Sequence, residues 1–142
     1  MNWINRTALL TTLSLTLLTI SGCGKKDETP KGKVFFAEPN DGAEIKGPVK
    51  VVMGLEGMKI QPAGDVVEGT GHHHLIINKG SISAGQVIPT DDDHKHFGKG
   101  QTETELELAP GEYKLTLQFA DGLHRSYGET LSSTINIKVA AN

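Results

Sequence analysis

Short segments in which apolar and polar residues alternate constrain the fold of this 142-residue chain more than any other feature. In the clearest one, residues 113–119, every odd position is apolar and is expected to face inward, with Lys114, Thr116 and Gln118 outward. Residues 102–108 and 131–139 show the same period of two. Because no window has a convincing helical period, the sequence predicts an all-β fold of antiparallel strands.

Turn residues separate seven or eight such strands, which is typical of a single β-sandwich or small barrel. Tyr113 follows Pro110 and Gly111 at the start of its strand, as in the tyrosine corner of immunoglobulin-like domains; an ordinary core aromatic is the other interpretation. Residues 72–78 end in apolar side chains on both faces, as expected of a central strand. We therefore predict an immunoglobulin-like antiparallel β-sandwich. Further strands are expected at residues 34–37, 49–53, near 58–60, and at 87–88.

The first 22 residues have the pattern of a secretion signal peptide. Arg6 is their only charged residue, and the apolar run at 8–20 is too short for a comfortable transmembrane helix of about 20 residues. The following residues complete the sequence LTISGC, which resembles the lipobox of bacterial lipoproteins, with Cys23 as the lipidated first residue of the mature protein. A plain soluble secretory signal and an uncleaved anchor are the alternatives.

Residues 23–33 offer no large apolar side chain to a core and are expected to form a flexible tether, with the β-sandwich domain over 34–142. The lipid on Cys23 would hold this domain on the membrane of the cell envelope. In a Gram-negative cell the expected location is the outer membrane, facing the periplasm.

Cys23 is the only cysteine, so its lipidation leaves the domain without a disulfide, a thiolate ligand or a cysteine nucleophile. A blue copper site needs a cysteine and is therefore excluded. Removing Arg6 with the signal changes the formal net charge from −3 to −4. The sequence offers no basic stripe, which excludes a nucleic-acid-binding protein.

All six histidines lie between positions 72 and 124, which indicates a divalent-metal site. Side chains two positions apart on a strand point the same way, about 6 to 7 Å apart. We therefore expect two pairs of neighbouring rings, and His73 should face the core as a buried, hydrogen-bonded structural histidine. The predicted ligands to copper(II) or zinc are His72, His74, His94, His96 and His124.

Three aspartates, Asp91, Asp92 and Asp93, directly precede the second histidine pair. They are candidates for acceptors of ring N–H groups around a metal, or for ligands to calcium, which needs six to eight oxygens. A plain acidic loop is the third interpretation. Histidines and aspartates could also form a hydrogen-bonded network that fixes the loops without any metal.

Three segments resemble a bacterial family of secreted domains of unknown function: residues 71–76 (GHHHLI), 94–102 (HKHFGKGQT) and 110–124 (PGEYKLTLQFADGLH). With the flanking strands the resemblance extends over roughly residues 34–139. It implies the β fold and an envelope location, and it places all six histidines in the family's characteristic segments. It brings no assigned activity with it.

These observations predict a lipid-anchored envelope protein that binds copper(II) or zinc for storage, delivery or protection. The alternative is an immunoglobulin-like module that recognises an envelope protein or cell-wall partner, with structural or pH-sensing histidines. A third is a copper-dependent redox enzyme that resembles copper-zinc superoxide dismutase, although the disulfide of that family is missing. The chain has no Gly-x-Ser-x-Gly elbow and no zinc-protease helix motif, so a non-enzymatic role is favoured.

Overall fold

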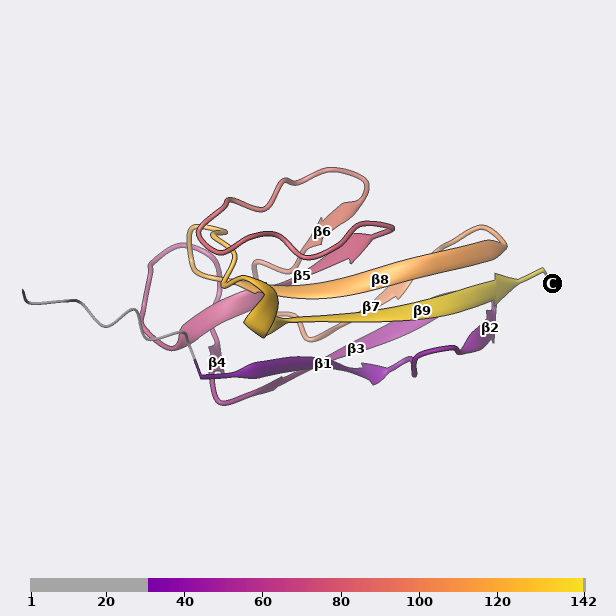
Figure 1. Cartoon of the computed structure of the whole chain (residues 1–142), viewed down its shortest axis with the longest axis horizontal. Helices are drawn as coiled ribbons and strands as arrows, with labels where there is room; N and C mark the ends of the chain where they lie inside the picture. Colours follow the sequence, from indigo (N-terminus) through magenta and orange to yellow (C-terminus); the bar gives the residue numbers. More distant parts are fainter. Residues whose placement is uncertain (1–30, 142) are drawn as a thin grey trace, which may run out of the picture.

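Two β-sheets packed face to face form the computed structural model, which describes residues 31–141 (Figure 1). The smaller sheet has the strand order β1-β3-β7, and the larger has the order β2-β9-β8-β5-β4, with β6 also paired to β5. The strands are β1 Lys33–Glu38, β2 Glu44–Lys46, β3 Val49–Glu56, β4 Lys59–Ile60, β5 Thr70–Ile77, β6 His94–His96, β7 Glu103–Leu106, β8 Gly111–Ala120 and β9 Ser132–Ala140.

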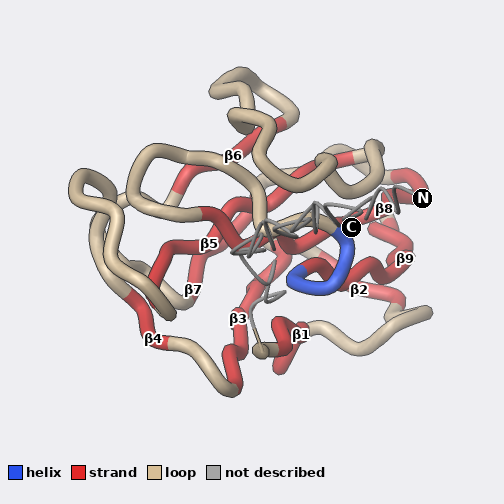
Figure 2. Tube along the Cα trace, turned by 60° about the vertical axis from the view of Figure 1, so that its left-hand side comes forward, coloured by secondary structure: helices blue, strands red, loops and turns tan. Residues whose placement is uncertain are grey.

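The described part of the chain contains no α-helix, and its single helical segment is the 3-10 turn η1, Glu129–Leu131 (Figure 2, blue). The predicted all-β sandwich is thus confirmed. Between residues 31 and 141 no helix has the length and hydropathy needed to cross a membrane. The predicted signal peptide, Cys23 and most of the tether lie outside the described residues.

The long strand pairs are antiparallel, as predicted: β1 with β3, β3 with β7, β5 with β8, and β8 with β9. Two short pairings among the described strands, β2 with β9 and β4 with β5, are parallel. The predicted strand at 87–88 is reduced to an isolated bridge between Val87 and Arg125. β5 runs through the larger sheet with β8 on one side and β4 and β6 on the other, which confirms it as a central strand.

The core lies between the sheets and is built by the alternating positions of the long strands. On β8, Leu115, Leu117 and Phe119 are fully buried, and β9 contributes every second residue from Ile135 to Val139. Tyr113 donates its hydroxyl hydrogen to the carbonyl oxygen of Ala109 at 2.9 Å. This bond back to the preceding turn is the tyrosine corner that the sequence suggested.

The outward face of β8 is covered, which the alternating pattern did not predict. Thr116 and Gln118 were expected to face solvent, but both are fully buried. The loop after β5 lies over them: Ile82 donates its N–H to Gln118 Oε1 at 3.0 Å, and Thr116 Oγ1 donates to the Lys79 carbonyl at 2.9 Å. Because these polar groups are satisfied by loop backbone, they can be buried, and the loop is fixed on the face that also carries His72 and His74.

Candidate metal centre

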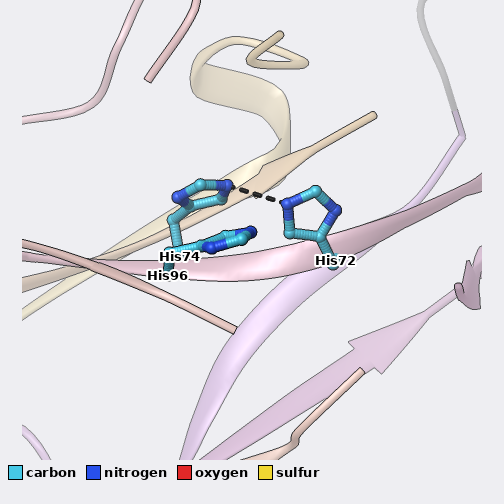
Figure 3. Close-up of side chains that lie close together, drawn as sticks. All are labelled: His72, His74 and His96. Carbon is cyan, nitrogen blue, oxygen red and sulfur yellow. Dashed lines mark hydrogen bonds between the residues drawn. The ribbon is translucent and has the colours of Figure 1, made fainter. Parts of the chain in front are cut away.

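β5 places two imidazoles side by side on the outer face of the larger sheet. His72 and His74 lie two positions apart on this strand and are both fully buried. Their Nε2 atoms are 3.0 Å apart (Figure 3). The predicted pairing of these two rings is therefore present in the structure.

β6 and the loop after β8 bring two more rings to the same place. His96 stands opposite His74 in the antiparallel pairing of β6 with β5, so both side chains leave the sheet on the same face. His124 lies with its Nε2 atom 3.1 Å from Nε2 of His96, and its ring centroid is 5.1 Å from that of His72. Four imidazoles from three separate segments thus converge.

The spacing of these nitrogens fits a metal ion. One candidate ligand atom from each of His72, His74 and His96 lies within 4.8 Å of the others. Nitrogens that bind zinc tetrahedrally at about 2.0 to 2.1 Å are about 3.3 Å apart. The two Nε2 pairs, at 3.0 and 3.1 Å, are already near this separation. The rings of His72, His74 and His96 could therefore hold a metal ion.

Burial keeps these rings neutral, and neutral imidazole is the form that binds a metal. Burial, followed by the neighbouring histidines, lowers the pKa of His72 to about 4 and that of His74 to about 2. The pKa of the more exposed His96 is also lowered, by desolvation and by His124. At neutral pH protons therefore do not compete with a metal for these three nitrogens.

The Nδ1 atoms of His72 and His74 are buried without a hydrogen-bond partner among the described residues. In most metal sites the second ring nitrogen of a histidine donates to a carboxylate or carbonyl, which fixes the ring. Here the rings of His72 and His74 contact each other and the rings of His96 and His124. No acidic side chain of residues 31–141 joins the three-histidine group, so its donor set consists of imidazole nitrogens.

His73 points to the opposite face of β5, into the core, as predicted. Its ring packs edge-on against Phe119 with centroids 5.2 Å apart, and the side chain is fully buried. The predicted hydrogen bonding is wrong, because neither ring nitrogen has a partner. Burial, with a smaller contribution from His72, lowers the pKa of His73 to about 4.

His94 is not brought into the cluster, although the sequence placed it among the ligands. The β5–β6 register sets His94 opposite Ile76, two pairs further along the strand than His96 and His74. Its Nδ1–H donates to Asp91 Oδ1 at 2.7 Å, and its side chain is nearly buried. His94 therefore serves to close the loop onto β6.

The three aspartates lie in the loop before β6 and outside the group formed by His72, His74 and His96. Asp91 Oδ1 also accepts the backbone N–H groups of Asp93 and His94, and the hydrogen bond with His94 lowers the pKa of Asp91. Asp93 forms an exposed ion pair with Lys79 at 3.0 Å, and Asp92 is exposed. Of the three, only Asp91 accepts a ring N–H, and that ring lies outside the cluster. The oxygen-rich cage that calcium requires is not assembled by the described carboxylates.

Sequence reasoning missed Gly98 as a residue of the site. A Cβ at this position would overlap the Cε1 and Nε2 atoms of the His96 ring. The ring of His96 thus lies over the backbone of the residue two positions further on. The spacing His-x-Gly in the segment HKHFGKGQT was the available signal.

We expect Gly98→Ala to lower metal affinity about 10-fold, because the added methyl group must push the His96 ring out of position, as a lost supporting contact does at other metal sites. The free energy of unfolding should change by less than about 1 kcal/mol, since the ring can move towards solvent. Calorimetric titration with zinc measures the first effect. Gly80→Ala is the matched control, because a Cβ there meets no atom within 4 Å. Equal affinity in both variants would contradict the placement of His96 at the metal.

Residues 51–140 match the family described as Domain of unknown function (DUF4399), and this range contains all six histidines. The chain belongs to this family. The resemblance inferred from the three sequence segments is thereby confirmed, and the family description assigns no activity.

No curated protein matches the chain. Among solved structures, the X-ray structure of the endo-β-1,4-mannanase from Thermotoga petrophila is similar with a TM-score of 0.44 and 19% sequence identity. The similarity covers 83% of this chain and 22% of the length of that enzyme. At this score and identity the comparison carries no argument about fold or function.

Proposed function

We propose that this domain binds one divalent transition-metal ion, copper(II) or zinc, through His72, His74, His96 and His124. The observation that carries the proposal is the convergence of ring nitrogens from β5 and β6 within 4.8 Å of one another. His124 adds a fourth nitrogen from the loop after β8, 3.1 Å from that of His96. Three or four imidazoles are the usual complement for these ions in the absence of thiolates.

The donor set supports the choice of metal. Neutral imidazoles suit zinc and copper, whereas calcium and magnesium take oxygen ligands. For nitrogen sites the general affinity order places copper(II) above zinc, so copper(II) is expected to bind more tightly. His96 is exposed, which gives an ion a path to the otherwise buried His72 and His74.

Storage, delivery or protection against metal ions in the cell envelope is the role that we propose for this site. It combines the histidine cluster with the lipobox-like sequence at Cys23, which would attach the domain to a membrane. An open, all-nitrogen site on a tethered domain can load and release an ion without a change of fold. A redox or hydrolytic reaction is not part of this proposal.

A structural role for the histidines is the second candidate, and one observation favours it. The rings pair with each other, His72 with His74 and His96 with His124. Such a network could fix the loops of a module that recognises an envelope partner.

Zinc titration followed by histidine NMR separates the two candidates. At one equivalent of zinc, the ring signals of His72, His74, His96 and His124 should shift together and saturate. The signals of His94 and His73 should change little, since His94 is hydrogen-bonded to Asp91 and His73 faces the core. Calorimetry with copper(II) should give a stoichiometry of one. If the four signals do not respond at near-stoichiometric zinc, the structural role is correct.

A further inference from the structure

The loop after β8 is organised by one buried carboxylate, that of Asp121, which is only 6% exposed. Its Oδ1 atom accepts the backbone N–H of Leu123 at 2.9 Å and that of Arg125 at 3.0 Å. Its Oδ2 atom accepts the Nε–H of Arg125 at 2.7 Å and forms an ion pair with Nη2 of the same guanidinium, also at 2.7 Å. The two oxygens thus hold the residues on either side of His124. These bonds also lower the pKa of Asp121 against the opposing effect of burial.

His124 has a backbone conformation that needs such support. Its φ angle is +64°, in the left-handed region that residues other than glycine seldom adopt. Its N–H donates to the Asp121 carbonyl at 2.9 Å, and its own carbonyl accepts the N–H of Ile88 at 2.9 Å. The backbone is therefore fixed from the turn on one side and from the covering loop on the other.

This conformation determines where the His124 ring lies. The ring meets His96 edge-on with centroids 4.6 Å apart, and it meets His72 in the same way at 5.1 Å. An extended backbone at residue 124 would send the side chain in another direction, because the left-handed conformation reverses the local path of the chain. The position of the fourth nitrogen thus depends on contacts made by a residue three positions earlier.

We propose that Asp121 is a positioning residue of the metal site, which holds His124 in the left-handed turn that delivers its ring to His72 and His96. This inference rests on the proposed metal binding. Asp121 acts through the backbone of residues 123–125. The ion pair with Arg125 further holds the Asp121 carboxylate in the turn.

A double-mutant cycle with copper(II) tests this role. Asp121→Ala should lower copper affinity 10- to 100-fold, the range typical of lost supporting contacts at metal sites. In a protein that already carries His124→Ala, the same change should lower affinity less than about 3-fold. The electron paramagnetic resonance spectrum of copper(II) bound to Asp121→Ala should match that of His124→Ala. In the metal-free protein, the His124 ring signal of Asp121→Ala should move towards that of an exposed histidine.

Two further variants separate the contacts of Asp121 from its charge. Asp121→Asn retains one oxygen for the backbone N–H groups but loses the contact of Oδ2 with Arg125, so its copper affinity should fall several-fold, less than that of Asp121→Ala. Should Asp121→Ala not fold, Arg125→Gln takes its place in the cycle, because the Arg125 side chain is 46% exposed and lies outside the core. The Arg125→Gln variant should bind copper(II) several-fold more weakly, again only when His124 is present. Asp92→Ala is the matched control at an exposed aspartate.

If Asp121→Ala lowered copper affinity equally in proteins with and without the His124 side chain, the positioning role would be overturned. An Asp121→Asn loss as large as that of Asp121→Ala would do so as well, because it would assign the effect to charge. Either result leaves copper binding by the unmodified domain intact. Failure of the unmodified domain to bind copper would instead overturn the proposed function.

Discussion

Replacing His74 by alanine should lower the affinity for copper(II) or zinc by at least about 100-fold, more than the loss of a supporting contact at a metal site. His74 contacts two other rings of the cluster, with its Nε2 atom 3.0 Å from that of His72 and its ring centroid 5.1 Å from that of His96. His74 is fully buried, so we expect no other side chain to replace its ring nitrogen as a ligand in the alanine variant. Calorimetric titration at neutral pH measures the loss.

Thermal unfolding gives an independent measurement of the same effect. A ligand that binds only the folded state at 100 times its dissociation constant adds about 2.7 kcal/mol to the free energy of unfolding. Zinc should thus raise the melting temperature of the unmodified domain, and His74→Ala should abolish this rise. His94→Ala is the control, because His94 bonds to Asp91 and lies opposite Ile76. If His94→Ala lost affinity as strongly as His74→Ala, the ligand set proposed above would be wrong.

The two histidine pairs show which parts of the candidate site can be predicted from the spacing of residues along the sequence. The neighbourhood of His72 and His74 follows from the two-residue repeat of a strand alone, and the structure has it. Which member of the second pair joins them depends on the register of β6 against β5. That register sets His96 opposite His74 and His94 opposite Ile76, and the spacing of the histidines does not fix it. Spacing could nominate both His94 and His96, but it could not choose between them.

Other features could not be predicted from local sequence either, because they depend on contacts between residues that are distant along the chain. The alternation in β8 located the core face, yet it could not show that a loop would cover Gln118 on the other face. The tyrosine corner was predictable because Tyr113 and Ala109 are close in sequence. The left-handed conformation of His124 depends on Asp121, Arg125 and Ile88 together. Local sequence determined strands and short turns, while long-range packing decided which polar side chains became buried.

The metal-free domain should lose stability steeply as the pH falls from 6.5 towards 4.5. Burial lowers the pKa of His72 and His73 to about 4 and that of His74 to about 2. Above pH 6.5 these rings are neutral in both the folded and the unfolded chain, so the free energy of unfolding has its full value. Below 6.5 the unfolded chain takes up protons that the folded domain does not, so the free energy of unfolding decreases. The decrease continues until the pH reaches the folded-state values.

The size of this loss makes acid unfolding readily measurable. Each such ring contributes about 1.4 kcal/mol per pH unit. Over two pH units the three rings together remove several kcal/mol, a large part of the 5 to 15 kcal/mol that stabilises a typical domain. Urea unfolding at a series of pH values measures the slope. A free energy of unfolding that stays constant between pH 6.5 and 4.5 would show that the buried rings are protonated or exposed in the folded state.

His73→Leu isolates the contribution of one ring, because His73 faces Phe119 in the core and lies outside the metal cluster. The slope with pH should decrease by about 1.4 kcal/mol per unit. At pH 7 the variant should be more stable by about 1 to 2 kcal/mol, since it removes two buried ring nitrogens that have no hydrogen-bond partner. His94→Leu is the contrasting variant and should lower stability at pH 7, because Asp91 loses the partner that closes its loop. A His73→Leu protein less stable than the unmodified domain would mean that its imidazole is held by interactions beyond packing on Phe119.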